Sequence, residues 1–446
     1  MKQIYGDVFT FWFGPYRWLV FNRVEHAQHI LTSRHIYEIS DLIVASLSLL
    51  VPNSISVARH QTWKRHARVI LPMLKRAKVV NYMDTIVECT DWLIYTHLTK
   101  VDGGRKDLRL KCQTLLLKII ESIAFGSDPM DNQKKTEHEQ QELFEALQDY
   151  TRSTGQLMIL TGVSKWLSKI YLSLNWKYQN ASRIIRQHCM SIVAEEQNHR
   201  EHISSPKSNR RNIFSFYVSS LNDNANDDDI SSGLTLPELL DEIKNFVHGG
   251  FDTTATVLAW LMHFASKHPH VQQRIKDELR EHDLIPVSDN VALNSDVLNS
   301  LIYVNCVIKE VFRCAPIIPG LSRTALCDDL IDGTIHVKKG DTVLIPIYNI
   351  HSDPRYWHID PSKFVPERFL HEDKDHHPFA FIPFGGGHRA CAGQELAWLE
   401  LKTIVTRLMQ RVTFEDTGME DNSGGYDQQM LCYPKHLAVN VRVDKE

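Results

Sequence analysis

Residues 378–402 read PFAFIPFGGGHRACAGQELAWLELK and contain the most informative pattern of the sequence. Three consecutive glycines, Gly385 to Gly387, separate an aromatic run from a lone cysteine, Cys391, and a pattern of helical period follows. Glycine permits backbone conformations and close approaches that other residues do not. The stretch therefore predicts a loop that holds either a nucleotide or a metal-bound thiolate.

The nucleotide hypothesis rests on the spacing Gly385-x-Gly387-x-x-Ala390, which fits the fingerprint of dinucleotide-binding loops. Three observations disfavour it. Pro383 lies where a central parallel strand would need an N–H donor. About 55 residues follow Ala390, too few to complete a doubly wound sheet. The hypothesis also gives Cys391 no task.

The metal hypothesis gives every part of the loop a role. A thiolate that binds haem iron needs flanking backbone free of bulk, and glycine permits this. A helix beginning near Gln394 would place N–H groups and the positive helix end beside the sulfur of Cys391, lowering the thiol pKa. Arg389 is within reach of a haem propionate. A buried free cysteine is the usual alternative, but it explains neither the glycines nor the arginine.

The segment FGGGHRACAG resembles the haem-binding signature F-x-x-G-x-R-x-C-x-G of the cytochrome P450 superfamily. The positions that match are Phe384, Gly387, Arg389, Cys391 and Gly393. The resemblance implies the cytochrome P450 fold, which is mainly α with minor β, with a long central helix over the haem. It also implies a haem b held non-covalently with Cys391 as its axial thiolate ligand. We expect residues 1–446 to form a single catalytic domain that lacks an N-terminal membrane anchor.

Two further segments match a structural network of the same family. KEVFRCAP contains Glu310 and Arg313, which share one helical face and can form an ion pair. In the family, a glutamate and an arginine at this spacing bind an arginine from a P-E-R-F segment. That segment is VPERF here, so Arg368 is the third member. The network is expected to hold the fold beneath the haem and to do no chemistry.

The segment GGFDTT, Gly249 to Thr254, lies within a long stretch of helix-forming composition. Mid-helix glycine costs about 1 kcal/mol relative to alanine, so the pair predicts close approach to a cofactor. The family's motif assigns Asp252 and Thr253 to proton delivery toward iron-bound oxygen. Some related enzymes carry a glutamate at the position of Gly249 that bonds to the haem, and glycine cannot do so, which again predicts a non-covalent haem.

The segment RHQTWKRHARVILP resembles one that binds a haem propionate through a tryptophan and an arginine four residues later. Trp63 fits, but position 67 is alanine and Arg68 comes one residue late, which turns the side chain by about 100°. Trp63 and Arg68 are therefore the candidates for this contact. Arg323, in GLSRTAL, matches an arginine that often binds the other propionate.

Composition excludes several functional classes. The net charge of -4 favours neither nucleic acid nor an anionic membrane as a partner. Eight scattered cysteines indicate neither a disulfide framework nor a zinc site. The sequence contains no run of 18 or more apolar residues, so it predicts no membrane-spanning helix. Peripheral contact with a membrane is compatible with the sequence. We expect the cytoplasmic face of the endoplasmic reticulum if the full-length form has an anchor, and a soluble cytoplasmic protein as the chain stands.

The remaining pattern predicts the order of elements. Residues 7–20 indicate a β-hairpin. Helical patterns run from residue 63 to about 203, across residues 234–268, and through two shorter segments at 269–282 and 296–314. Residues 221–233 are polar and acidic and predict an exposed loop, and residues 336–353 predict strands and loops.

The function that the resemblance implies is monooxygenation: one oxygen atom of O₂ enters a small hydrophobic substrate such as a fatty acid, steroid or xenobiotic. Electrons would come from NADPH through a separate cytochrome P450 reductase. Its docking surface is predicted to include the cations Lys64, Arg65, Arg68, Lys75, Arg76 and Lys78. Residues expected to line the substrate pocket are Phe246, Ile317, Ile318, Leu321, Met430 and Leu431. A haem-thiolate isomerase that rearranges peroxides, and a haem-binding protein without turnover, are the alternatives.

Overall fold

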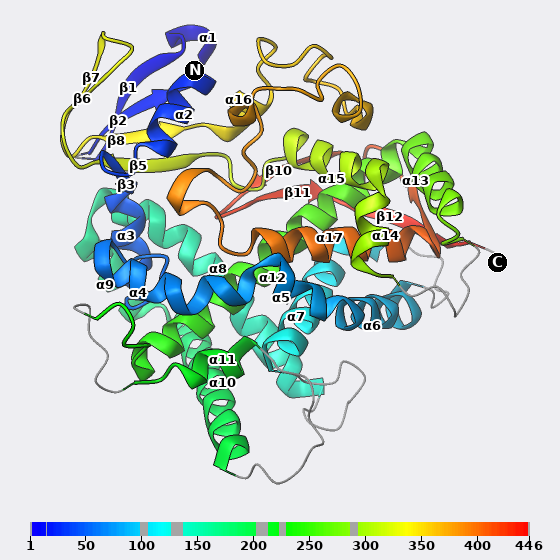
Figure 1. The fold of residues 1–446 in the computed structure, drawn as a ribbon, viewed down its shortest axis with the longest axis horizontal. Coiled ribbons are helices and arrows are strands. Elements are labelled where there is room, and N and C mark those ends of the chain that lie inside the picture. Colours follow the sequence, from blue (N-terminus) through cyan, green and yellow to red (C-terminus); the bar gives the residue numbers. More distant parts are fainter. Residues whose placement is uncertain are drawn as a thin grey trace.

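A 32-residue helix, α12 (Leu236–Lys267), runs through the middle of the helical part of the protein (Figure 1). The structure, a computed structural model, describes residues 2–14, 16–98, 106–125, 137–201, 213–222, 229–285 and 293–444. The side chain and backbone of Thr235 and the carboxylate of Glu238 form a capping box at the start of α12. The helix is buried over most of its length and packs against α7, α10, α15 and α17. The predicted long central helix is confirmed.

The described residues form a large helical part and a smaller β part, as predicted (Figure 1). The α-helices are α1 Lys2–Tyr5, α2 Val24–Thr32, α3 Asp41–Leu47, α4 His60–Ile70, α5 Arg76–Val79, α6 Met83–Leu93, α7 Leu108–Phe125, α8 Glu137–Val163, α9 Lys165–Leu174, α10 Trp176–Glu201, α11 Ile213–Ser219, α12, α13 Pro269–Glu281, α14 Ser295–Ser300, α15 Ile302–Cys314, α16 Ile347–His351 and α17 Gln394–Met409. Shorter helical turns are η1 Leu71–Leu74, η2 Val80–Tyr82, η3 Ile94–Leu98, η4 Pro366–Phe369, η5 Pro378–Ala380 and η6 Gly387–Arg389.

The principal sheet has the strand order β1-β2-β8-β5-β3 and lies apart from the long helices, at the upper left of Figure 1. The strands are β1 Val8–Phe13, β2 Tyr16–Phe21, β3 Tyr37–Ile39, β4 Lys106–Asp107, β5 Leu321–Ala325, β6 Asp329–Ile331, β7 Ile335–Val337, β8 Thr342–Ile345, β9 Val412–Asp416, β10 Gly424–Gln428, β11 Cys432–His436 and β12 Ala438–Val443. The pair β1–β2 is antiparallel with Phe13 opposite Tyr16, which confirms the predicted hairpin. The pair β2–β8 is parallel.

Two local predictions differ from the structure, and a third lies partly outside the described residues. The segment predicted as one helix over residues 296–314 is two helices, α14 and α15, because Leu301 leaves the helical conformation (φ -74°, ψ 81°). Residues 347–351, predicted as strand or loop, form α16. The predicted loop at 221–233 lies partly outside the described residues, which omit 223–228. Among the residues that the structure describes, no helix is both long and apolar enough to cross a membrane.

Candidate active site

The glycine–cysteine loop joins η5 to α17 without a preceding strand. Residues 381–384 form an extended segment and a turn, so the strand that a dinucleotide loop requires is missing at this point of the chain. The backbone N–H of Cys391 donates to the carbonyl oxygen of Phe384 at 2.9 Å, which closes the loop on itself. The helix α17 begins at Gln394, as predicted. The loop therefore presents Cys391 at the N-terminal end of a helix.

The glycines of this loop pack closely against neighbouring elements. Gly387 has φ +72°, and a Cβ atom at this position would lie 1.9 Å from the carbonyl oxygen of Leu31 in α2. Gly385 has φ +73° and packs against Leu321, whose Cδ1 atom would be 3.4 Å from such a Cβ. Both conformations favour glycine. Gly387 is thus required by its contact with α2, a role that the sequence did not predict, and clearance for a cofactor stays a prediction.

Cys391 is solvent-accessible, although neighbouring protein atoms partly desolvate its thiol. Burial raises its pKa, and a hydrogen bond from the backbone N–H of Gly393 opposes that rise. The net direction is opposite to the predicted lowering of the pKa. The N–H group at the sulfur is present as expected, and a bound metal ion would stabilise the thiolate further. Phe384 packs its ring against Phe312 and Trp398, with centroids 5.1 and 5.9 Å away.

The two glycines of α12 have different environments. A Cβ atom on Gly249 would meet no atom within 4 Å, whereas one on Gly250 would lie 2.7 Å from Cδ1 of Ile120 in α7. Gly250 therefore allows α7 and α12 to approach. Gly249 faces open space, although α12 is otherwise mostly buried. One turn further on, Thr253 Oγ1 donates to the carbonyl oxygen of Gly249 at 2.7 Å, so the two residues share a face.

Asp252 is 2% exposed and points away from that face. Gln113 in α7 donates to its Oδ1 atom at 2.7 Å, and the hydroxyl of Tyr433 in β11 donates to Oδ2 at 2.5 Å. The guanidinium of Arg109 lies over the ring of Tyr433, 3.7 Å from its centroid. Both oxygens of this buried carboxylate are therefore held by side chains from other elements. Sequence reasoning missed these partners because they are distant in the chain.

Three predicted site residues meet beside the loop. The guanidinium of Arg389 lies over the ring of Trp63, 4.9 Å from its centroid. Arg389 donates through Nε to Oε1 of Glu38 at 2.8 Å and through Nη2 to the carbonyl oxygen of Ala58 at 2.8 Å. Arg323 belongs to the same electrostatic group, because Glu38 and Arg389 both act on its pKa. Glu38, in β3, was not predicted.

Arg323 is a buried cation with unused donors. It is 6% exposed, and the one hydrogen bond that its side chain makes within the described residues joins Nη1 to the carbonyl oxygen of Ser322 at 3.0 Å. Burial lowers its pKa to about 10, and Glu38 offsets only part of that effect. Near it, Nδ1 of His388 is buried without a hydrogen-bond partner. Desolvated donors of this kind fit an anionic ligand group.

The cofactor fit follows from these observations. The accessible Cys391 thiol suits a thiophilic metal ion, and the open face at Gly249 suits a flat group lying against α12. The spare N–H donors of Arg323 suit carboxylates at the edge of that group. These residues fit haem, with its iron and two propionates.

Arg68 is not brought to this edge. It is exposed, and the electrostatic contact that the structure shows for it is with Asp229. Ala67, half-buried, lies one helical turn after Trp63 on the same side of α4. The single-residue shift noted in the sequence thus places a methyl group where a cation was expected. Arg68 is not supported as a propionate ligand.

On the opposite side of α4, two side chains bind glutamates of α12. Arg65 is buried and donates to Oε2 of Glu238 at 3.0 Å, and His66 Nδ1 lies 2.6 Å from Oε1 of Glu242. Arg65 therefore does not belong to an exposed docking surface, which corrects that part of the prediction. The other five predicted cations, Lys64, Arg68, Lys75, Arg76 and Lys78, are exposed.

The structure brings Glu310, Arg313 and Arg368 together with no solvent exposure. Both carboxylate oxygens of Glu310 accept from Arg313 at 2.8 Å, and Oε1 also accepts from Arg368 at 3.0 Å. Asp373, which sequence reasoning missed, accepts from Arg368 at 3.0 Å and balances the second arginine. Two buried guanidinium groups are thus paired with two carboxylates.

The predicted pocket residues divide into two groups. Ile317 and Leu431 are buried by protein, and the carbonyl oxygen of Ile317 accepts from the N–H of Cys432 at 2.8 Å, so these two segments are neighbours. The more accessible residues are Phe246, Ile318, Leu321 and Met430. Phe246 shares the α12 face of Gly249 and packs edge-on against Phe214 at 5.5 Å. The accessible group is better placed to contact a ligand.

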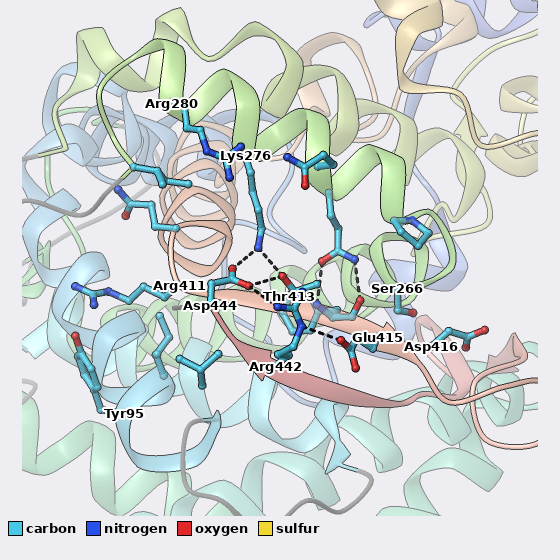
Figure 2. A pocket seen from close by; sticks show the side chains of 18 residues that line it. Tyr95, Ser266, Lys276, Arg280, Arg411, Thr413, Glu415, Asp416, Arg442 and Asp444 are labelled. Carbon is cyan, nitrogen blue, oxygen red and sulfur yellow. Dashed lines mark hydrogen bonds and ion pairs between the residues drawn. The ribbon is translucent and has the colours of Figure 1, made fainter. Parts of the chain in front are cut away.

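A separate cavity of about 1120 Å³ lies between α13, β9 and the end of β12 (Figure 2). Its charged side chains largely satisfy one another: Lys276 binds Asp444, and Arg442 binds Glu415. None of the site residues predicted from the sequence lines it. The cavity is therefore distinct from the site around Cys391.

Known proteins resemble this chain over nearly its whole length. The sequence model of the family described as Cytochrome P450 matches residues 1–440. Human Cytochrome P450 4V2 is 26% identical over 442 residues, covering 95% of this chain and 80% of that protein. Human Cytochrome P450 3A7 is 26% identical over 375 residues, covering 81% and 70%. A solved cyanobacterial CYP120A1 with bound retinoic acid shares the fold, with a TM-score of 0.80 at 20% identity, covering 99% of this chain and 93% of that one.

Proposed function

Because the chain belongs to the cytochrome P450 family, a family of haem-thiolate monooxygenases, we propose that it inserts one oxygen atom of O₂ into a hydrophobic organic substrate with electrons from a separate NADPH-dependent reductase. The observation that carries this proposal is Cys391, solvent-accessible just before the N-terminal end of α17, with the backbone N–H of Gly393 at its sulfur. When bound there, haem with a thiolate ligand supplies the activation of O₂.

The chain's own residues supply proton handling. Thr253 keeps its hydroxyl on the accessible face of α12 by donating to Gly249, so its oxygen remains able to accept a hydrogen bond from a neighbour. Asp252 is the buried acid next to it, fixed by Gln113 and Tyr433. We assign proton delivery to this pair, with Asp252 as the acid and Thr253 as the hydroxyl nearer the substrate.

Hydrophobic residues near the loop and α12 support an apolar substrate. Phe246, Ile318, Leu321 and Met430 are partly or largely accessible and none carries a charge. A pocket with this lining selects ligands by shape and apolar area. Fatty acids, steroids and xenobiotics are the proposed classes, and retinoids join the screen because the cyanobacterial relative of similar fold binds retinoic acid.

A basic groove behind the cysteine loop supports an acidic redox partner. It has a volume of about 290 Å³ and is lined by residues of α5, α15 and α17. Burial lowers the pKa of Lys402, and the nearby cations Arg76 and Lys309 lower it further, so three positive charges gather here. Such a surface attracts an acidic partner. We place the reductase over this groove, beside Glu395 of the first turn of α17.

An apolar surface around α9 supports contact with the endoplasmic reticulum membrane. The side chains of Trp166 and Trp176 are 67% and 71% exposed, and Lys165, Lys169 and Lys177 surround them. Tryptophan beside lysine is typical of the membrane interface. The β1–β2 hairpin reaches the same region, where Gly14 contacts Gly162 at the end of α8.

The test starts with purified protein reconstituted with haem. The reduced carbon monoxide difference spectrum should show the band of a thiolate ligand, and Cys391→Ser should abolish the band and turnover. NADPH consumption with added reductase and substrate, accompanied by oxygenated product, separates a monooxygenase from a haem-thiolate isomerase. A Cys391→Ser variant that keeps the thiolate spectrum would refute the proposal.

A further inference from the structure

Glu38 brings a negative charge into the cations beside the cysteine loop. It lies in β3 and is 6% exposed. Its Oε1 atom accepts hydrogen bonds from Arg389 Nε and from the backbone N–H of Ile39, each at 2.8 Å. Nε2 of His388 lies 3.6 Å from the same oxygen. A buried carboxylate held in this way stays ionised at neutral pH, since Arg389 and the Ile39 N–H lower its pKa against the opposing effect of burial.

The charges around Glu38 sum to a small positive value. Arg323 and Arg389 contribute two positive charges and Glu38 removes one. Burial lowers the pKa of His388, so this imidazole is neutral at pH 7. Ala67 offers no charge on the Trp63 side of α4. The outer pair Arg59–Asp41, with 2.6 Å between Nη2 and Oδ1, is already balanced.

We propose that Glu38 sets the charge at the haem edge: it neutralises Arg389 and, among the residues that the structure describes, leaves Arg323 as the uncompensated cation for two propionates. This inference rests on the proposed function, because it requires a haem in the site. Two consequences follow from Coulomb's law in a poorly hydrated environment. The haem is held less firmly than a doubly cationic edge would hold it. The added negative charge also favours ferric over ferrous iron, so it lowers the midpoint potential.

The variant Glu38→Gln isolates the charge, because the glutamine amide oxygen can still accept from Arg389 and from the Ile39 N–H. The measurements are the rate of haem transfer to excess apomyoglobin and the midpoint potential of the ferric–ferrous couple in a dye-monitored titration. We expect haem transfer to slow severalfold and the midpoint potential to rise. Glu415→Gln removes an exposed carboxylate from β9 and is the matched control, with neither quantity changed.

A second variant keeps the inference testable if Glu38→Gln does not fold. Ala67→Arg adds a cation beside Trp63 and should change both quantities in the same direction. Unchanged values in either variant overturn the inference. Faster haem transfer from Glu38→Gln also overturns it, because Glu38 would then serve only to hold Arg389 in place. A wild-type protein without the thiolate spectrum refutes the proposed function instead, so the two failures are distinguishable.

Discussion

The hydroxyl of Tyr433 donates to Oδ2 of Asp252 across 2.5 Å, and both residues are almost fully buried. Tyr433 belongs to β11 and Asp252 to α12, so the contact joins the C-terminal part of the chain to the central helix. Burial and the neighbouring carboxylate raise the pKa of Tyr433, which keeps the phenol protonated and able to donate. The position of the acid thus depends on a strand far from it in sequence.

Replacement of Asp252 tests its assignment to proton delivery. Asp252→Asn keeps the size of the side chain but cannot carry the proton, so product formed per NADPH consumed should fall by about 100-fold or more. Tyr433→Phe should cause a smaller fall, because Gln113 still holds Oδ1. Tyr426→Phe, a half-exposed tyrosine on β10, is the matched control. Equal coupling in Asp252→Asn and wild type would contradict the assignment.

The buried network predicts a large loss of stability when one partner is removed. Glu310→Gln leaves two fully buried arginines short of one carboxylate, and the free energy of unfolding should fall by about 3–5 kcal/mol. Urea unfolding measures this change. Arg442→Gln breaks an exposed pair with Glu415 and should cost less than about 1 kcal/mol. Similar losses in the two variants would show that burial of the network does not matter.

The contact between His66 and two glutamates predicts a loss of stability at alkaline pH. Burial alone would lower the pKa of His66, but the hydrogen bonds and charges of Glu238 and Glu242 raise it to about 9. Because the folded-state pKa exceeds the unfolded value of about 6.5, the stabilisation is complete below about pH 6.5 and is lost as pH rises through about 9.

Unfolding midpoints of the wild type should therefore decline between about pH 6.5 and 9.5, and His66→Gln should flatten this decline. His282→Gln, which replaces a histidine outside the cluster, should keep the wild-type slope. A wild-type profile that rises through this window would contradict the ion pair.

Alanine substitutions at Gly387 and Gly333 distinguish the stability cost of steric overlap from that of backbone strain. They have similar φ angles, +72° and +68°, but a Cβ atom on Gly387 would lie 1.9 Å from a backbone oxygen, whereas one on Gly333 would meet nothing within 4 Å. Gly333→Ala should cost about 1–2 kcal/mol. Gly387→Ala should cost clearly more and release haem, as measured by unfolding and by the thiolate spectrum. Equal costs would show that α2 yields to the loop.

The surface around α9 predicts vesicle binding. The double variant Trp166→Ser, Trp176→Ser should reduce sedimentation with vesicles of phosphatidylcholine and phosphatidylserine severalfold, because two interfacial rings are removed. Met419→Ser changes another exposed apolar residue, 72% exposed, in the turn after β9, and should leave binding unchanged. Undiminished binding by the double variant would place the membrane contact elsewhere.

Sequence reasoning succeeded where a feature is local. The glycine–cysteine loop, the helix from Gln394 and the long helix with its glycine pair all have signals within a few residues. Even the failure of Arg68 was foreshadowed, since a shift of one residue turns a helical side chain by about 100°. The resemblance to short family motifs, together with helical periodicity, thus predicted this part of the site.

The sequence contains no local pattern that predicts which side chains pair between distant elements. Glu38 meets Arg389 across 351 positions and Asp252 meets Tyr433 across 181, and neither pair follows from propensity or spacing. The close contact of Gly387 with the carbonyl oxygen of Leu31 was not predicted either, because Leu31 belongs to another element. Asp373 was missed for a different reason: it lies only five residues after Arg368, but no motif or spacing in the sequence marked it as a partner. Tertiary packing decides such contacts.

Because Gly249 faces open space and Gly250 contacts α7, Gly249 can be substituted without disturbing the packing of α12 against α7. In the family that the sequence resembles, some enzymes carry a glutamate at the position of Gly249 that bonds covalently to the haem. The Gly249→Glu variant would give this chain a carboxylate for a covalent bond to the haem, while Gly250 would still leave room for the side chain of Ile120. A catalyst built on this scaffold for use in organic solvents, where loosely held cofactors wash out, would start from that single exchange.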